Sequence, residues 1–195
     1  MLHIEPVALS TDLLTLRPLS LGDVPALGEA ARDGALWEKR TTTVPRPEGF
    51  GEYVKKALEL QAAGLALPFA TVVRDGNRVV GSTRYMNIDA ANHRVEIGTT
   101  WIGKTWQRTF VNTHAKFLML RHAFEVLGCN AVEIRTHSQN DQSRAAIERL
   151  GAKLDGILRR HMIMPDGHIR DTAVYSIIAE EWPEVRARLE RRLAD

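Results

Sequence analysis

The stretch TWQRTFVNTHAK, residues 105–116, joins a predicted strand to a predicted helix and could bind an anion. The first amides of a helix have no partner within the helix, and they lie at the positive end of the helix dipole. A phosphate or pyrophosphate group can therefore bind at such a position. The loop contains no glycine, which is required only where the turn needs a positive φ or has no room for a Cβ. The alternative is an ordinary helix entrance in which Asn112 caps the first amides.

A second candidate for chemistry is the carboxylate of Glu96, which interrupts an apolar strand. Strand alternation predicts that Trp101 shares the face of Val95 and that Glu96 lies on the opposite face. A carboxylate there could face a cleft and accept a proton from an amine, directly or through water. The alternatives are a structural ion pair with Arg84 or Arg94, or a side chain in solvent.

Composition limits the classes of protein that this chain can represent. Its 195 residues suffice for one domain with a real core, and the formal net charge of +2 is too small to indicate a nucleic-acid or membrane partner. The single cysteine, Cys129, excludes an internal disulfide and a cysteine-cluster metal site, and we interpret it as a small packed thiol. The chain contains no run of eighteen apolar residues and no basic segment followed by a long apolar run at its start. We expect a single domain over residues 1–195 in a cytoplasmic protein, with neither a nucleic-acid nor a membrane partner.

The elements that would position these residues follow from periodicity and from turn residues. Helices are predicted over 21–33, from Pro47 onward, over 112–127 up to Gly128, over 140–150 up to Gly151 and over about 180–194. Strands are predicted over 13–20, 69–76, 78–88, 94–103 and 131–137, and a hairpin with the turn PDG over 154–178. The pattern indicates an antiparallel meander followed by a strand, helix, strand crossover.

Two long motifs and a short one carry a resemblance to a known family. They are WQRTFVNTHAKFLMLRHAFEVLGCNAVEIRT, NDQSRAAIERLGAKLDGILRRHMIMPDGHIRDTAVYSI and the closing EEWPEV. In this order they resemble the GNAT superfamily of acyl-CoA-dependent N-acyltransferases, and most closely the branch related to the ribosomal-protein N-terminal acetyltransferases. The resemblance implies an α/β (α+β) fold with a mixed, mostly antiparallel sheet, flanking helices and a splayed strand pair that binds acyl-CoA.

The resemblance also implies a binding site for the acyl donor, acetyl-CoA. The pyrophosphate would bind at the start of the central helix, on a loop comprising Gln107, Arg108, Thr109, Phe110, Val111, Asn112 and Thr113. Phe110 and Asn112 stand where the family usually has small residues. Backbone groups of Trp101 and Ile102 would pair with the pantetheine arm as an added strand would. Asn140 and Ser143 would touch the pantetheine or amide region of CoA, although a plain helix cap explains them equally well.

The implied reaction transfers an acetyl group from acetyl-CoA to a primary amine of a small molecule, an amino acid or a protein N-terminus. The amine would attack directly, without a metal or a covalent enzyme intermediate. Glu96 is the candidate base, and Tyr175, with Tyr85 as a weaker rival, is the candidate acid for the leaving thiolate. The alternative for Tyr175 is a core residue with a satisfied hydroxyl. Homodimer formation is compatible with the family.

A second hypothesis is a degenerate family member that binds acyl-CoA, or no ligand, and serves as an interaction module. Phe110 in the loop and His114, where the branch commonly has Glu, keep this hypothesis open. His114 is expected at the surface of the first helical turn. Polar residues of the last hairpin either shape the acceptor pocket or form a polar surface: Arg159, Arg160, His161, His168, Arg170 and Asp171.

Overall fold

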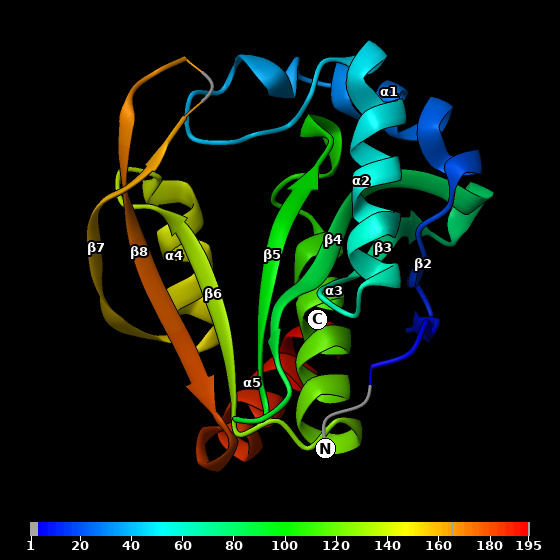
Figure 1. Ribbon diagram of the computed structural model, residues 1–195. Coiled ribbons are helices and arrows are strands. Elements are labelled where there is room, and N and C mark those ends of the chain that lie inside the picture. The colour runs from blue at the N-terminus through cyan, green and yellow to red at the C-terminus, as the bar shows by residue number, and fades with distance from the viewer. Residues whose placement is uncertain (1–3, 165, 195) are drawn as a thin grey trace.

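The computed structural model, which describes residues 4–164 and 166–194, contains one eight-stranded sheet in the order β1-β2-β3-β4-β5-β6-β8-β7 (Figure 1). The strands are β1 (Leu9–Ser10), β2 (Leu14–Pro18), β3 (Leu67–Val73), β4 (Arg78–Asp89), β5 (Arg94–Ile102), β6 (Ala131–His137), β7 (Lys153–Ile163) and β8 (Ile169–Ile178). All neighbouring pairs are antiparallel except β5 and β6, which are parallel. The predicted mixed, mostly antiparallel sheet is confirmed.

In the described residues, five α-helices cover the two faces of the sheet (Figure 1). They are α1 (Val24–Arg32), α2 (Phe50–Ala62), α3 (Phe110–Arg121), α4 (Asp141–Leu150) and α5 (Trp182–Ala194). Side chains of α3, α4 and α5 share one apolar cluster with the sheet, whereas those of α1 and α2 share a second cluster. We therefore refer to the α3 face and the α2 face of the sheet.

Local sequence signals explain several element boundaries. Asp23 accepts hydrogen bonds from the amide and the hydroxyl of Ser20, so the predicted cap precedes α1. Gly151 ends α4 in the left-handed region with φ of 105°. The predicted hairpin connects β7 to β8; Gly167 of its turn has φ of 84°, and Pro165 lies outside the described residues.

The sheet splits between β5 and β6, as Figure 1 shows. The two strands pair at only three positions, of which Glu96 opposite Glu133 is the last, while β5 continues to Ile102 and β6 to His137. Because β6 stays paired with β8 along its whole length, the split separates two halves of the sheet. The backbone groups that face the split have no strand partner among the described residues.

A β-bulge in β5 overturns the predicted alternation of its side chains. Thr99 has φ of 49°, and the register with β4 shifts between Ser82 and Arg84. Trp101 therefore packs in the α2-face cluster, on the side of Glu96, instead of sharing the face of Val95. The prediction for Trp101 was wrong because strict alternation holds only in a strand without an extra residue.

The helix that follows the loop begins earlier than predicted. Thr109 is the N-cap of α3 and accepts a hydrogen bond from the amide of Val111, so Asn112 is the third helical residue and not the cap. At the other end α3 stops at Arg121, and a π-helical turn, His122–Val126, continues the chain. The predicted single helix up to Gly128 is therefore two segments.

Candidate active site

The loop that precedes α3 needs a glycine-like conformation at one position only. Arg108 has φ of 63°, a value that favours glycine, whereas Phe110 and Asn112 lie inside the helix. The Phe110 ring packs edge-on against Trp106, at 6.3 Å between ring centroids, and against His114, at 5.3 Å. Phe110 and Asn112 therefore occupy positions whose backbone does not require glycine, and strain is confined to Arg108.

Side chains brace this loop from within. Gln107 donates from Nε2 to the carbonyl of Ile102 at 2.8 Å, which connects the loop to the end of β5. Thr109 donates from its hydroxyl to the carbonyl of Trp106 at 2.7 Å. Helix geometry leaves the first amides of α3 without intrahelical partners, and the cap takes only that of Val111. The loop therefore presents free backbone amides at the positive end of α3, beside the open end of the split.

His114 is buried, which contradicts the predicted surface position. Its Nδ1 lies 2.8 Å from the hydroxyl of Thr11, and burial lowers the pKa of the imidazole. Because Thr11 precedes it by 103 residues, no local pattern could have indicated this contact. A neutral His114 is a structural residue that fixes the N-terminal segment to α3.

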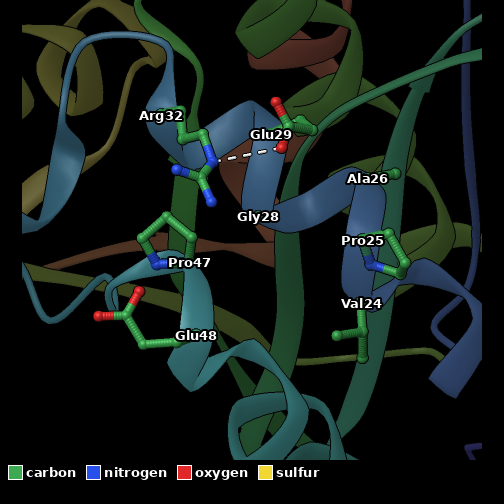
Figure 2. A pocket seen from close by; sticks show the side chains of 8 residues that line it. All are labelled: Val24, Pro25, Ala26, Gly28, Glu29, Arg32, Pro47 and Glu48. Carbon is green, nitrogen blue, oxygen red and sulfur yellow. Dashed lines mark ion pairs between the residues drawn. The ribbon is translucent and has the colours of Figure 1, made fainter.

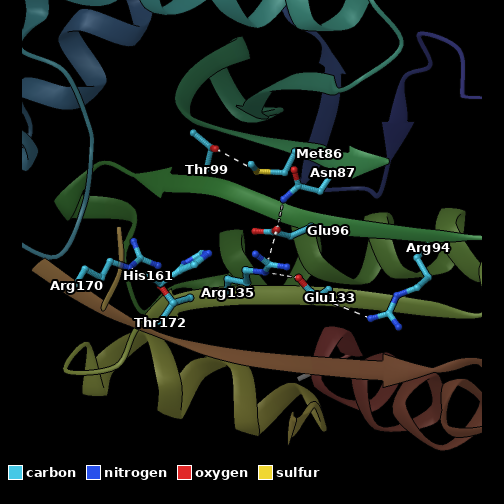
Figure 3. A network of polar contacts seen from close by, with 10 residues as sticks. All are labelled: Met86, Asn87, Arg94, Glu96, Thr99, Glu133, Arg135, His161, Arg170 and Thr172. Atoms are coloured by element: carbon cyan, nitrogen blue, oxygen red, sulfur yellow. Dashed lines mark hydrogen bonds and ion pairs between the residues drawn. The ribbon is translucent and has the colours of Figure 1, made fainter. Parts of the chain in front are cut away.

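Glu96 lies on the α2 face at the point where β5 and β6 separate (Figure 3), and it is only 6% exposed. Its Oε2 accepts a hydrogen bond from Asn87 Nδ2 at 2.7 Å and lies 3.5 Å from Arg135 Nε. Burial raises the pKa of the carboxyl, and Asn87 and Arg135 partly oppose that rise. Glu96 is therefore a desolvated carboxylate at the edge of the split, which suits a general base.

The arginines around Glu96 differ from those predicted to pair with it. Arg94 contacts Glu133 at 3.4 Å, and Arg135 contacts both Glu133 and Glu96. Arg170 donates from Nε to Thr172, on the strand beyond the split (Figure 3). The alternative of an ion pair with Arg84 or Arg94 is not observed; β6 instead brings Arg135 to the Glu96 carboxylate.

Tyr175 is separated from Glu96 by the sheet. Its side chain is 0% exposed in the α3-face cluster, and its hydroxyl donates to Glu148 Oε1 at 2.8 Å and accepts from Arg144 Nε at 2.9 Å. Both partners belong to α4, so the phenol anchors that helix. Burial raises the pKa of the Tyr175 hydroxyl. Tyr85 is also buried on the α3 face, where it donates to the carbonyl of Met119. The structure does not bring either phenol together with Glu96.

Asn140 and Ser143 form the predicted cap of α4. The Asn140 side-chain oxygen accepts a hydrogen bond from the amide of Ser143 at 3.1 Å, and Ser143 is the third residue of the helix. Ser143 is four residues before buried Ile147, so both lie on the stripe that faces the sheet. The cap is confirmed, and contact of these residues with CoA stays a prediction.

The sequence interpretation missed the burial of two cations. Lys116 is 5% exposed on α3, and its ammonium donates to the hydroxyl of Thr100 at 2.9 Å. Burial lowers its pKa to about 7. Arg84 is 7% exposed on the α2 face. A signal for Lys116 was available, since it stands in the apolar run AKFLML, but Arg84 carries no such signal.

The last hairpin reaches the loop between α1 and α2. Arg40 contacts Asp166 at 2.9 Å, and Asp166 in turn contacts His168, which lies 3.2 Å from His137 of β6. His161 and Arg170 both contact Thr172 at the open end of the split. Part of the predicted polar cluster therefore borders the α2 face, which supports a role in the acceptor pocket.

One surface hollow lies apart from these residues. It has a volume of about 510 Å³ between α1 and the turn that precedes α2, and Figure 2 shows Arg32 and Glu29 paired at its rim. It is lined by Val24, Pro25, Ala26, Gly28, Glu29, Arg32, Pro47 and Glu48. None of the predicted site residues lines it, so we place the candidate site at the split.

Two further properties concern metals and membranes. Within residues 4–164 and 166–194, no group of three or more histidine, cysteine, aspartate or glutamate side chains is placed to hold a metal ion. No helix in this part of the chain has the length and apolar character needed to cross a membrane.

The sequence of this chain is similar to a known family and to a named protein. The family profile described as "Acetyltransferase (GNAT) domain" matches residues 14–153. YdaF of Bacillus subtilis, whose name assigns it provisionally to the ribosomal N-acetyltransferases, is 33% identical over 113 residues. That match covers 58% of this chain and only 60% of YdaF.

Solved structures share the fold over nearly the whole chain. A GCN5-related N-acetyltransferase from Brucella melitensis has a TM-score of 0.84 and 30% identity, with 96% of this chain and 86% of that chain covered. The ribosomal L7/L12 acetyltransferase RimL, solved in complex with coenzyme A, has a TM-score of 0.76 and 19% identity, with 88% and 98% covered. The likeness to RimL concerns the fold alone.

Proposed function

Because this chain belongs to the GNAT acetyltransferase family, we propose that it transfers an acetyl group from acetyl-CoA to a primary amine. The acceptor would be a small molecule, an amino acid or a protein N-terminus, and the amine would attack the thioester directly. The observation that carries the proposal is the buried carboxylate of Glu96 at the point where β5 and β6 part.

The donor would bind at the split, on the side of α3. The free amides at the start of α3 would hold the pyrophosphate, and the positive end of the helix dipole would add to the attraction. The unpaired backbone of β5 beyond Glu96, including Trp101 and Ile102, would pair with the pantetheine arm. RimL, which shares the fold, was solved in complex with coenzyme A, and this supports coenzyme A as the ligand class.

Glu96 would act as the general base. An amine attacks a thioester carbonyl only when its lone pair is free, so the ammonium form must lose a proton first. Burial raises the pKa of the Glu96 carboxyl, which makes its carboxylate a stronger base. Asn87 and Arg135 hold the carboxylate in one orientation.

The leaving thiolate requires no positioned acid in this proposal. Thiols have a pKa of about 8.5, so water at neutral pH can supply the proton after the carbon–sulfur bond breaks. The hydroxyl of Tyr175 is already held by Glu148 and Arg144 on the far face of the sheet. We therefore assign the chemistry to Glu96 and a stabilising role to Tyr175.

The test is a Glu96→Gln variant, assayed for acetylation of a panel of primary amines and for CoA binding by calorimetry. Glutamine keeps the size of the side chain and removes the base, so we expect kcat to fall by about 10²- to 10⁴-fold while CoA affinity is unchanged. A Glu59→Gln variant is the matched control, because Glu59 is an exposed carboxylate of α2 that is assigned no role in the site. Full activity of Glu96→Gln would refute the assignment, and CoA binding by the unaltered protein without turnover would favour an interaction module.

A further inference from the structure

The most unusual charged group on the α2 face is Arg84 of β4. Its side chain is 93% buried, and its Nε and Nη2 atoms have no hydrogen-bond partner among the described residues. The guanidinium lies 5.2 Å from the ring centroid of Tyr53, and no carboxylate in residues 4–164 or 166–194 forms an ion pair with it. A buried guanidinium whose N–H groups lack acceptors is costly, so its presence needs an explanation.

The surroundings of Arg84 hold it in a fixed position. Tyr53 lies against the guanidinium, and its hydroxyl accepts a hydrogen bond from Trp101 Nε1 at 3.3 Å. Phe50 packs against both rings, at 5.4 Å between centroids in each case. An aromatic wall of this kind orients a planar guanidinium and still leaves its N–H groups without acceptors.

Arg84 lies close to the proposed base. In the register of β4 and β5, Arg84 is opposite Gly98 and Met86 is opposite Glu96, so Arg84 and Glu96 are diagonal neighbours on one face. Diagonal neighbours in a sheet are about 7–8 Å apart. Gly98 contributes no side chain between them, and a Cβ there would lie 2.4 Å from the sulfur of Met86. The same Cβ would lie 3.0 Å from Glu96 Oε1, so the space above Gly98 is bordered by Met86 and by the proposed base.

We propose that Arg84 binds an anionic group of the acceptor, which is therefore an amine that carries a carboxylate or a phosphate a few bonds from its nitrogen. This inference rests on the proposed function, since it places the amine at Glu96. The guanidinium fork matches the paired oxygens of either anion. The other charges point the same way: Arg135 and Arg170 add two cations near Glu96, against the carboxylates of Glu96 and Glu133.

The test uses calorimetry on the CoA-saturated protein with three pairs of amines: glycine and glycinamide, β-alanine and β-alaninamide, and O-phosphoethanolamine and ethanolamine. We expect the anionic member of at least one pair to bind about tenfold to a hundredfold more tightly, because a hydrogen-bonded charge contributes on this scale. Whether the carboxylates or the phosphate show the preference identifies the anion. Binding does not depend on turnover, so an intact preference without acetylation would leave the anion site standing and refute only the proposed function.

Variants separate ligand binding from a structural role. Arg84→Met should abolish the preference, Arg84→Lys should retain part of it, and Arg78→Met, an exposed arginine of the same strand, should leave it unchanged. The melting temperature of free Arg84→Met should equal or exceed that of the parent, because an uncompensated buried charge has been removed. Retention of the preference by Arg84→Met would overturn the proposal. Equal binding of both members of every pair, or no binding of any of the six amines, would also overturn it.

Discussion

Replacement of Lys116 by methionine should stabilise the protein at neutral pH. The ammonium is buried in α3, donates to the hydroxyl of Thr100 and has a pKa of about 7 instead of 10.5. Each pKa unit corresponds to about 1.36 kcal/mol, so keeping this lysine in the fold costs at most about 5 kcal/mol at or below pH 7. Relaxation around a buried charge lowers such costs, and the variant loses one hydrogen bond, so we expect a gain of about 2–3 kcal/mol.

The stability gained by the Lys116→Met replacement should depend on pH. Between pH 7 and 10.5 the unfolded chain holds a proton on Lys116 that the folded chain has lost, so this residue's contribution to stability rises with pH across that window. Lys116→Met removes that rise, and its advantage over the parent should shrink toward zero near pH 10. Urea unfolding of both proteins at pH 7 and pH 9.5 measures the difference, with Lys56→Met on the exposed side of α2 as control. A Lys116→Met protein that is less stable than the parent at pH 7, or whose difference from the parent is independent of pH, would refute the reasoning.

Three further variants, at Arg108 and Tyr175, test the loop and the tyrosine. Arg108→Gly should raise the free energy of unfolding by about 0.5–1 kcal/mol because it relieves the positive φ, whereas Arg108→Ala should not. If the guanidinium attracts the pyrophosphate, the CoA affinity measured by calorimetry should fall equally in both variants. An unequal loss of affinity would mean that the loop conformation matters instead. Tyr175→Phe should lower the free energy of unfolding by about 1–2 kcal/mol, because the hydrogen bonds to Glu148 and Arg144 are lost. The pH–rate profile of acetylation should not change. Loss of the alkaline limb of that profile would restore Tyr175 as the acid.

The sequence predicted those parts of the fold that depend on neighbours in the chain. Strand 131–137 and the caps at Ser20 and Gly151 were predicted correctly, because periodicity and turn residues act over a few positions. The N-cap of α3 was misplaced by three residues, since both Thr109 and Asn112 can cap a helix. The bulge at Thr99, which no pattern of apolar residues marks, reversed the face of Trp101.

The site was harder to predict because its contacts join distant segments. Glu96 was identified from its place in an apolar strand, but its partners Asn87 and Arg135 come from two other strands. His114 was predicted at the surface, and the role of Tyr175 was left open, for the same reason. The polar partner of His114 lies on the N-terminal segment and that of Tyr175 on α4, so both contacts depend on how the elements pack. Arg84 is informative through the partners that it lacks, and the absence of a partner is invisible in a sequence.

The split between β5 and β6 gives the interior of the sheet two strand edges. Unpaired backbone groups at a strand edge can pair with strands of other molecules, and most proteins have features that prevent such pairing. Here the second half of β5 and the opposing part of β6 are each paired on one side only, yet both lie between other strands of the same sheet. A strand of another molecule could reach these edges only through the opening of the split. The protein therefore keeps two unpaired strand edges for a ligand while the flanking strands hinder pairing with other chains. Amides there should exchange with solvent faster than their central position in the sheet implies.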